Sequence, residues 1–354
     1  MKKLYLYTLL FCGVTFSVMA QKEQIKTAQA ELTKGNVQGA LTILNEIEYL
    51  ITNAKDEDKS DYYFTKAKTY TALANKKIDG PKNMSLAVGC YNELILSEVD
   101  SGNLKYAVQA REAVKELKSE LERSSADDNN AQRFSDAAIK MTYLYEMDKK
   151  DTVNLYNAAS NYFNAKQYDL ALKTYEMLKT MKYSGNGMEY YAVNKSTKQE
   201  ELFVSGANRD LGVKQGSHEK PRNAKAKSKK TDILKRIAYI YSEKGDIANA
   251  ESNYKAIIAI NPNDAETYLD LAYVKLDRKK EIADKMALLG TSPEDMKKYD
   301  ELKIKKDEEV KVAVGYLEKA LSLEPSNKDI SKLLLNLYRS LDMTDKYEAL
   351  KAKG

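Results

Sequence analysis

Chemically reactive side chains are few and widely separated in this chain. Its single histidine is His218, its two cysteines are Cys12 and Cys90, and tryptophan is absent. A zinc site needs several histidine, cysteine or carboxylate ligands that converge, and nucleophilic catalysis needs a nucleophile with a base beside it. No short stretch of the sequence supplies either set, so the sequence predicts no metal, no cofactor and no catalytic residue.

Adjacent carboxylates are the remaining candidates for acid–base chemistry. They occur at Glu200-Glu201, Asp127-Asp128 and Glu308-Glu309. A carboxylate pair that cleaves a glycosidic bond must face that bond from both sides, whereas sequence neighbours point in different directions. We expect these acids to be solvated charges. No glycine-rich phosphate-binding loop is found either, so the sequence predicts a protein that is not an enzyme.

The first twenty residues have the pattern of a signal peptide. Lys2 and Lys3 precede an apolar run, and Val18-Met19-Ala20 supplies the small residues that a signal peptidase needs. The run is too short to span a bilayer, and no later stretch has eighteen uncharged apolar residues. The sequence predicts cleavage near Ala20, export to the periplasm, outer membrane or exterior, and no membrane-spanning segment.

Cleavage leaves Cys90 as the only cysteine, so no internal disulfide can form. Its neighbours in LAVGCYNELI are mostly apolar. We therefore expect Cys90 to be a buried small side chain and not a reactive thiol.

An internal repeat decides the fold class. Residues 154–180, 233–262, and 267–276 with 312–325 share one pattern of large residues and alanines. The matching positions are Leu155, Ala158, Ala159, Tyr162, Ala171, Tyr175 and Leu178; Leu234, Ile237, Ala238, Tyr241, Gly245, Ala250, Tyr254, Ile257 and Pro262; and Tyr268, Leu271, Ala272, Ala313, Leu317, Ala320 and Pro325.

These positions resemble the tetratricopeptide repeat, a helix-turn-helix unit of 34 residues. Alanine lets two antiparallel helices approach closely, while the large residues fill the spaces between turns. Weaker matches occur earlier, at Ala40, Ala67, Ala87 and Ala137. The resemblance implies an all-α fold, a solenoid of stacked helix pairs with a concave surface, in a secreted bacterial protein.

The repeat pattern divides the chain into segments. They are a signal peptide at 1–20, divergent helices at 21–130, a repeat at 131–183, an inserted segment at 184–230, further repeats at 231–326 that include a lengthened helical hairpin at 277–311, and capping helices at 327–354. Within the lengthened hairpin, Gly290 is a stop signal and Ser292-Pro293 is a start signal for helices.

The insertion has two parts. In MEYYAVNKSTKQEELFV, alternating apolar residues up to Val204 flank the turn-forming NKSTK, which predicts a β-hairpin leaning on a helix face. Residues 214–236 then carry nine basic side chains against two acidic ones, which predicts a basic loop leading into a helix.

The resemblance implies binding in place of catalysis, with a partner peptide or helix held in the concave groove. The implied groove residues are Tyr156, Ser160, Phe163, Asn164, Lys235, Tyr239, Ser242, Glu243, Leu269, Tyr273 and Leu276. The family's lysine–asparagine clamp for a carboxylate is absent, because Tyr239 stands where asparagine is required.

We therefore expect a non-catalytic scaffold that binds an envelope protein through the groove, the insertion, or both. In the insertion the candidates are Tyr190, Tyr191 and Phe203, although the hairpin could equally brace neighbouring repeats. The alternative is binding of an anionic glycan or lipid through Lys225, Lys227, Lys229 and Lys230. Nucleic acid is disfavoured by the export signal and by the lack of aromatic residues among these lysines.

Overall fold

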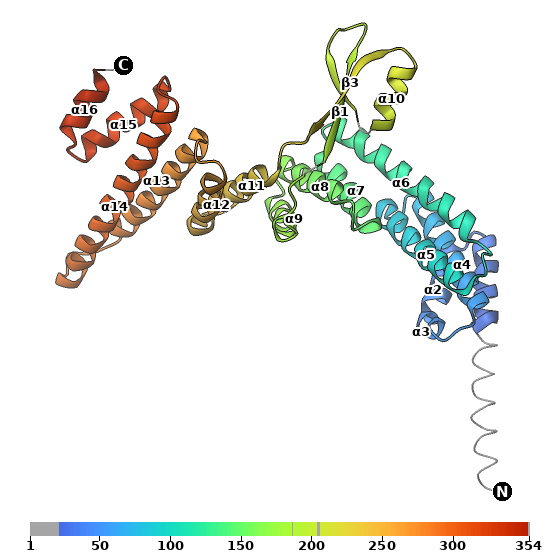
Figure 1. Cartoon of the computed structure of the whole chain (residues 1–354). Helices are drawn as coiled ribbons and strands as arrows, with labels where there is room; N and C mark the ends of the chain where they lie inside the picture. The colour runs from blue at the N-terminus through green and yellow to red at the C-terminus, as the bar shows by residue number, and fades with distance from the viewer. Residues whose placement is uncertain (1–20, 186, 204–205, 353–354) are drawn as a thin grey trace. The chain divides into compact units, whose positions relative to one another are not determined.

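The computed structural model of the chain describes residues 21–185, 187–203 and 206–352. The predicted signal peptide and Val204, at the end of the predicted hairpin, lie outside these residues. The chain divides into two units, residues 1–171 and residues 172–354 (Figure 1).

The described part of the first unit is helical. A helical stretch at residues 21–33 is followed by α2 (Val37–Glu46), α3 (Glu48–Ile51), α4 (Asp56–Asn75), α5 (Gly80–Ser101), α6 (Ala107–Asn130), α7 (Phe134–Met147) and α8 (Thr152–Asn164). Consecutive helices from α4 to α8 pack against one another. Ala67, Ala87 and Ala138 are fully buried between them, as the repeat pattern requires. The predicted array of helix pairs is confirmed.

Cys90 packs at the edge of the apolar cluster that joins α4, α5 and α6. Burial raises the pKa of its thiol to about 12, so the thiolate is not formed near neutral pH. This agrees with the expected role of a small buried side chain.

Asp128, expected to be solvated, is buried at the end of α6. Burial alone would raise the pKa of its carboxyl group, but hydrogen bonds from Lys140 and Arg133 outweigh that effect and lower it. The Arg133 Nε lies 2.8 Å from Asp128 Oδ1. The expectation of a solvated charge was wrong because Lys140 reaches Asp128 from the following helix, α7.

The second unit contains an inserted sheet between helices. Its elements are α9 (Tyr168–Thr180, which begins just before the unit), β1 (Met188–Asn194), β2 (Glu200–Phe203), α10 (Gly206–Lys214), β3 (His218–Lys225), α11 (Lys230–Glu243), α12 (Ile247–Ile260), α13 (Ala265–Ala287), α14 (Pro293–Leu323), α15 (Lys328–Ser340) and α16 (Thr344–Lys351).

The predicted hairpin is confirmed, and it is part of a larger sheet. Strand β1 pairs antiparallel with β2, with Tyr191 opposite Leu202, and on its other side pairs antiparallel with β3. Helix α10 packs on this sheet (Figure 1). Residues 218–225, expected as a loop, form β3 because an edge strand tolerates Pro221 and charged residues that a central strand would not.

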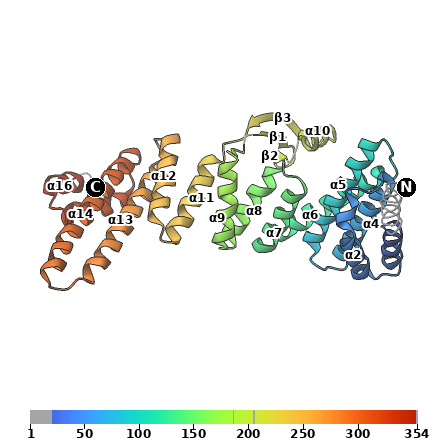
Figure 2. The same ribbon diagram turned by 90° about the horizontal axis from the view of Figure 1, so that it is seen from below.

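The long hairpin of α13 and α14 also agrees with the sequence. Both views show the two helices side by side (Figure 2). The hydroxyl of Ser292 accepts a hydrogen bond from the Asp295 backbone N–H at 3.1 Å, and Pro293 occupies the first turn.

An ion-pair cluster lies within the α13–α14 hairpin and ties it to α12. Lys275 Nζ lies 2.9 Å from Glu251 Oε2 and 3.0 Å from Glu309 Oε2. Glu309, expected to be solvated, is half-buried there, so that expectation was wrong.

None of the helices in the described part of the chain combines the length and apolar character that crossing a bilayer requires.

Glu98 provides a test of how α6 begins. Its buried carboxylate accepts hydrogen bonds from the backbone N–H groups of Tyr106 and Ala107, each at 2.8 Å, because no side chain at the N-cap does so. Glu98→Ala leaves these donors unpaired, and we expect the free energy of unfolding to fall by about 2 kcal/mol. Urea denaturation followed by circular dichroism measures this loss.

The matched control is Glu93→Ala, an exposed glutamate on the same helix. It should change the free energy of unfolding by less than about 0.5 kcal/mol. Equal effects at the two positions would show that Glu98 does not cap α6.

Candidate functional site

Two rows of side chains on the first helices of consecutive repeats form a continuous surface in the second unit. Residues four and three apart share one face of a helix, so each row has a common direction. An ion pair of 2.6 Å between Lys235 Nζ and Glu266 Oε1 joins the rows. We call this surface the α11–α13 face; it consists of Lys235, Tyr239 and Ser242 on α11 and Glu266, Asp270 and Tyr273 on α13.

Tyrosine supplies the apolar part of the α11–α13 face. Tyr239 is 40% exposed and Tyr273 is 50% exposed, although both are large. Tyrosine is enriched at protein interfaces because its stiff ring buries much area at a low entropy cost. Both predicted groove tyrosines therefore expose part of their side chains.

Asp270 carries an unusual carboxylate on the same face. Its side chain is half-buried, and its Oδ2 atom is fully buried and accepts no hydrogen bond from the described residues. Burial raises the pKa of Asp270 to about 6; Lys235 acts against this rise, while Glu266 and Asp264 add to it. A carboxylate with this environment favours a hydrogen-bond donor or a cation.

Tyr254 of α12 lies beneath both rows. It is buried, and burial followed by the charge of Asp270 raises the pKa of its hydroxyl, with Ser242 acting in the opposite direction. Tyr254 belongs to the apolar cluster that includes Ala238 of α11 and Leu271 of α13, so it packs between the two helices.

Sequence reasoning missed Asp270 by one position. Leu269 and Leu276, expected in the groove, pack instead against the apolar cluster of α14 and α15. The available signal was the spacing of Glu266, Asp270 and Tyr273 at four and three residues, which places all three on one helix face.

The other predicted groove residues lie elsewhere. Tyr156, Ser160 and Phe163 are half-buried on α8 in the first unit, and Asn164 is exposed at the end of that helix. Glu243 is exposed at the end of α11.

The aromatic residues of the insertion contact the sheet's own cations. The Arg222 guanidinium lies 4.2 Å from the centre of the Tyr191 ring and also pairs with Glu200. Arg209 lies 5.5 Å from the centre of the Tyr190 ring. These contacts lie within the insertion and hold its strands and α10 together.

His218 of β3 makes polar contacts through both ring nitrogens, and one of them reaches strand β2. Its Nε2 lies 2.9 Å from Glu201 Oε2, its Nδ1 lies 2.9 Å from Ser217 Oγ, and its ring meets Phe203 edge-on. These contacts among Ser217, His218 and Glu201 were not predicted from the sequence, because strand pairing is what brings Glu201 to the histidine.

The Ser217 hydroxyl also lies 2.9 Å from the backbone carbonyl of Gly212, which can accept its proton. The direction of the Ser217–His218 hydrogen bond depends on the tautomer of the histidine. Hydrogen bonds from His218 and then Asn194 lower the pKa of Glu201. The described residues contain no cluster of His, Cys, Asp and Glu able to hold a metal ion.

The predicted basic residues are exposed around the end of the insertion. Lys225 ends β3, Lys227 and Lys229 follow it, and Lys230 begins α11. The backbone of Lys229 donates to the Ser184 carbonyl at 2.6 Å, so the segment is tied at this point.

No family model and no curated protein matches the chain. Among solved structures, it is similar to the C-terminal part of a TPR repeat-containing protein from Cytophaga hutchinsonii, at 11% identity over 93% of each chain with a TM-score of 0.39. It is also similar to a TPR repeats protein from Bacteroides fragilis, at 16% identity over 77% of this chain and 98% of that one, with a TM-score of 0.31. A double mutant of MamA matches at 12% identity over 67% of this chain and 91% of that one, with a TM-score of 0.38. These likenesses are too distant to bear on function, and the tetratricopeptide-like fold rests on the helix pairs themselves.

Asp270 predicts a pH-dependent stability difference. Between about pH 4, where an unfolded aspartate ionises, and pH 6, the folded state keeps a proton that the unfolded state has released. Wild-type stability therefore falls as the pH rises through this window. We expect Asp270→Asn to be more stable than wild type by about 1 kcal/mol above pH 6, with the gain shrinking toward pH 4.

Urea denaturation at several pH values measures this difference. Asp277→Asn, at an exposed position of the same helix, is the control and should show no such trend. A gain for Asp270→Asn that is independent of pH would mean that ionisation of Asp270 is not its cause.

Proposed function

We propose that the chain is a non-catalytic scaffold that binds a partner protein through the α11–α13 face. The observation that carries this proposal is the half-buried Asp270 carboxyl group, whose Oδ2 accepts no hydrogen bond from the described residues, on the same face as two exposed tyrosines. A buried acid without a hydrogen-bond donor lowers the stability of the free protein. Such a residue is retained in evolution more readily when a bound partner supplies the missing donor.

The chemistry of the face defines the partner's segment. It carries a lysine or arginine that donates to Asp270, and an apolar surface that covers the rings of Tyr239 and Tyr273. A charge-assisted hydrogen bond to a half-buried carboxylate is stronger than one on an open surface.

We further propose that the scaffold is exported and that its partner belongs to the cell envelope. The support is the pattern of the first twenty residues, with two lysines, an apolar run and small residues before Gln21.

Site-specific photocrosslinking tests the binding face. We expect a photoreactive residue at Tyr239 to capture one envelope protein in the native host, and Asp270→Asn to reduce the yield at least about tenfold, as expected for a buried charged contact. A photoreactive residue at Tyr49, which is 75% exposed in the first unit, is the control. Mass spectrometry identifies the captured protein and also gives the N-terminus of the exported chain.

Deletion of residues 188–225 tests whether capture depends on the α11–α13 face or on the sheet. Gly187 and Ala226 are already joined by a backbone hydrogen bond of 2.8 Å, so the deletion leaves ends that meet. The same capture from this chain would support the α11–α13 face. Capture that is lost with the sheet but unaffected by Asp270→Asn would refute it.

The second candidate function is binding of an anionic glycan or lipid through the basic segment. The specific observation is that Lys225, Lys227 and Lys230 are exposed and form no ion pair with any described residue. Arg222 of the same segment is already neutralised by Glu200 and contributes less.

Vesicles that contain anionic lipid test this candidate. Retention should fall steeply with added salt and should be lost when Lys225, Lys227, Lys229 and Lys230 are all replaced by alanine. Replacing Lys297, Lys298, Lys303 and Lys305 of α14 by alanine makes the same charge change on another surface and should preserve retention. An equal loss of vesicle retention in the two variants would mean that retention depends on net charge and not on the basic segment.

A further inference from the structure

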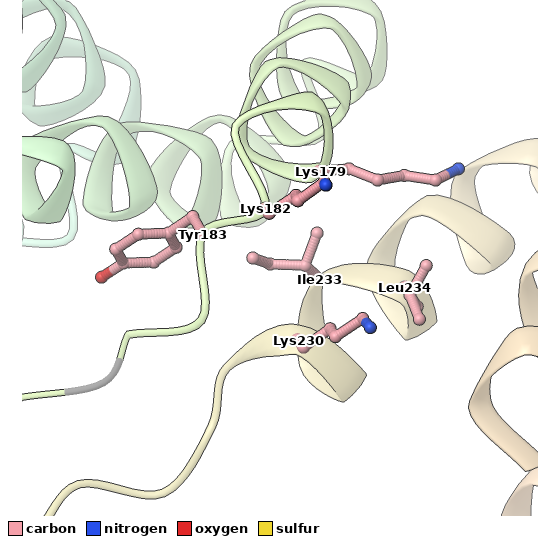
Figure 3. Close-up of a pocket in the computed structure, with 6 residues that line it drawn as sticks. All are labelled: Lys179, Lys182, Tyr183, Lys230, Ile233 and Leu234. Carbon is pink, nitrogen blue, oxygen red and sulfur yellow. The ribbon is translucent and has the colours of Figure 1, made fainter. Parts of the chain in front are cut away.

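A small pocket lies where the insertion leaves and rejoins the repeats. Its volume is about 280 Å³, and it is bounded by the end of α9 with the turn that follows and by the first turns of α11 (Figure 3). The lining residues are Lys179, Lys182, Tyr183, Lys230, Ile233 and Leu234, all in the second unit.

Backbone contacts hold both walls of the pocket. Helix α9 ends in a left-handed turn at Lys182, with the Tyr183 N–H bonded to the Leu178 carbonyl at 2.9 Å. The opposite wall is fixed because Lys229, just before α11, donates to Ser184. The pocket is therefore part of the fold.

The pocket combines apolar walls with unpaired cations. Ile233 and Leu234 supply an apolar floor, and the Tyr183 ring stands at one side (Figure 3). Lys179 is occupied, since its Nζ donates to Asn253 Oδ1 at 2.9 Å and lies 3.5 Å from Glu176. Across residues 21–185, 187–203 and 206–352, neither Lys182 nor Lys230 has a carboxylate partner.

Volume and polarity together restrict the occupant. The pocket volume of about 280 Å³ is just below the smallest typical small-molecule sites, which have volumes of about 300 Å³. A compact polyanion such as phosphate would lose its hydration against the apolar floor without compensation. A single anionic group on an apolar body satisfies both the lysines and the floor.

We propose that this pocket binds a small amphiphilic carboxylate. The carboxylate lies between the ammonium groups of Lys182 and Lys230, and the apolar body lies on Ile233, Leu234 and the Tyr183 ring. This proposal is independent of the partner-binding face, because it uses none of the residues of that face.

The probe is 2-naphthoate, with the uncharged 2-naphthamide as its matched control. Calorimetric titration of the full chain should show saturable binding of the acid and at least about tenfold weaker binding of the amide. Lys182→Gln combined with Lys230→Gln should weaken binding of the acid at least about tenfold. Lys303→Gln combined with Lys305→Gln on α14 removes the same charge outside the pocket and should leave binding unchanged.

A single tryptophan locates the bound probe, because the chain has none of its own. Fluorescence of Tyr183→Trp should respond to 2-naphthoate with the calorimetric affinity, whereas Tyr49→Trp in the first unit should not respond. Equal affinity for acid and amide, or unchanged affinity after loss of Lys182 and Lys230, would overturn the proposal. If Tyr183→Trp does not fold, the calorimetric titrations of the lysine variants and of the amide still test the proposal.

Discussion

Close approach of antiparallel helices at alanine is the constraint on which the structure depends. Ala158, Ala238 and Ala272 on first helices, and Ala250 and Ala313 on second helices, have no exposed surface. A larger side chain at these positions would push the helices apart and tilt the next pair. Each helix pair sets the position of the next one. The alanine contacts therefore determine how the exposed faces of successive first helices line up.

The inserted sheet does not disturb the packing of the helices, because the two ends of the insertion lie next to each other. Ser184 pairs with Lys229 and Gly187 with Ala226 through backbone hydrogen bonds, so α9 ends and α11 begins close to the same point. The sheet then needs its own stabilisation, which the Tyr191–Arg222–Glu200 contacts and the His218 hydrogen bonds supply. Joining the insertion in this way also leaves a space between α9 and α11, which is the pocket.

Features set by local spacing could be predicted from the sequence. The alanine positions, the turn at NKSTK and the Ser292 cap each depend on residues within one or two turns. Strand β3 could not be predicted, because HEKPRNAK has no strand-forming pattern and becomes a strand only through β1. The Asp128–Lys140 contact, the pairing of Glu201 with His218 and the pocket depend on segments brought together by packing, so residue order alone does not reveal them.

Asp270 differs from three other buried carboxylates in the partners that surround it. Glu98 accepts two backbone N–H groups, Asp128 is held by two cations, and Glu251 contacts Lys275 and Lys255. Each of these acids is buried together with groups that compensate for its desolvation. Asp270 has only Lys235 nearby, and that lysine is already paired with Glu266. These three acids have partners within the chain, whereas Asp270 Oδ2 accepts no hydrogen bond from the described residues, which is why the proposed partner segment carries a donor for it.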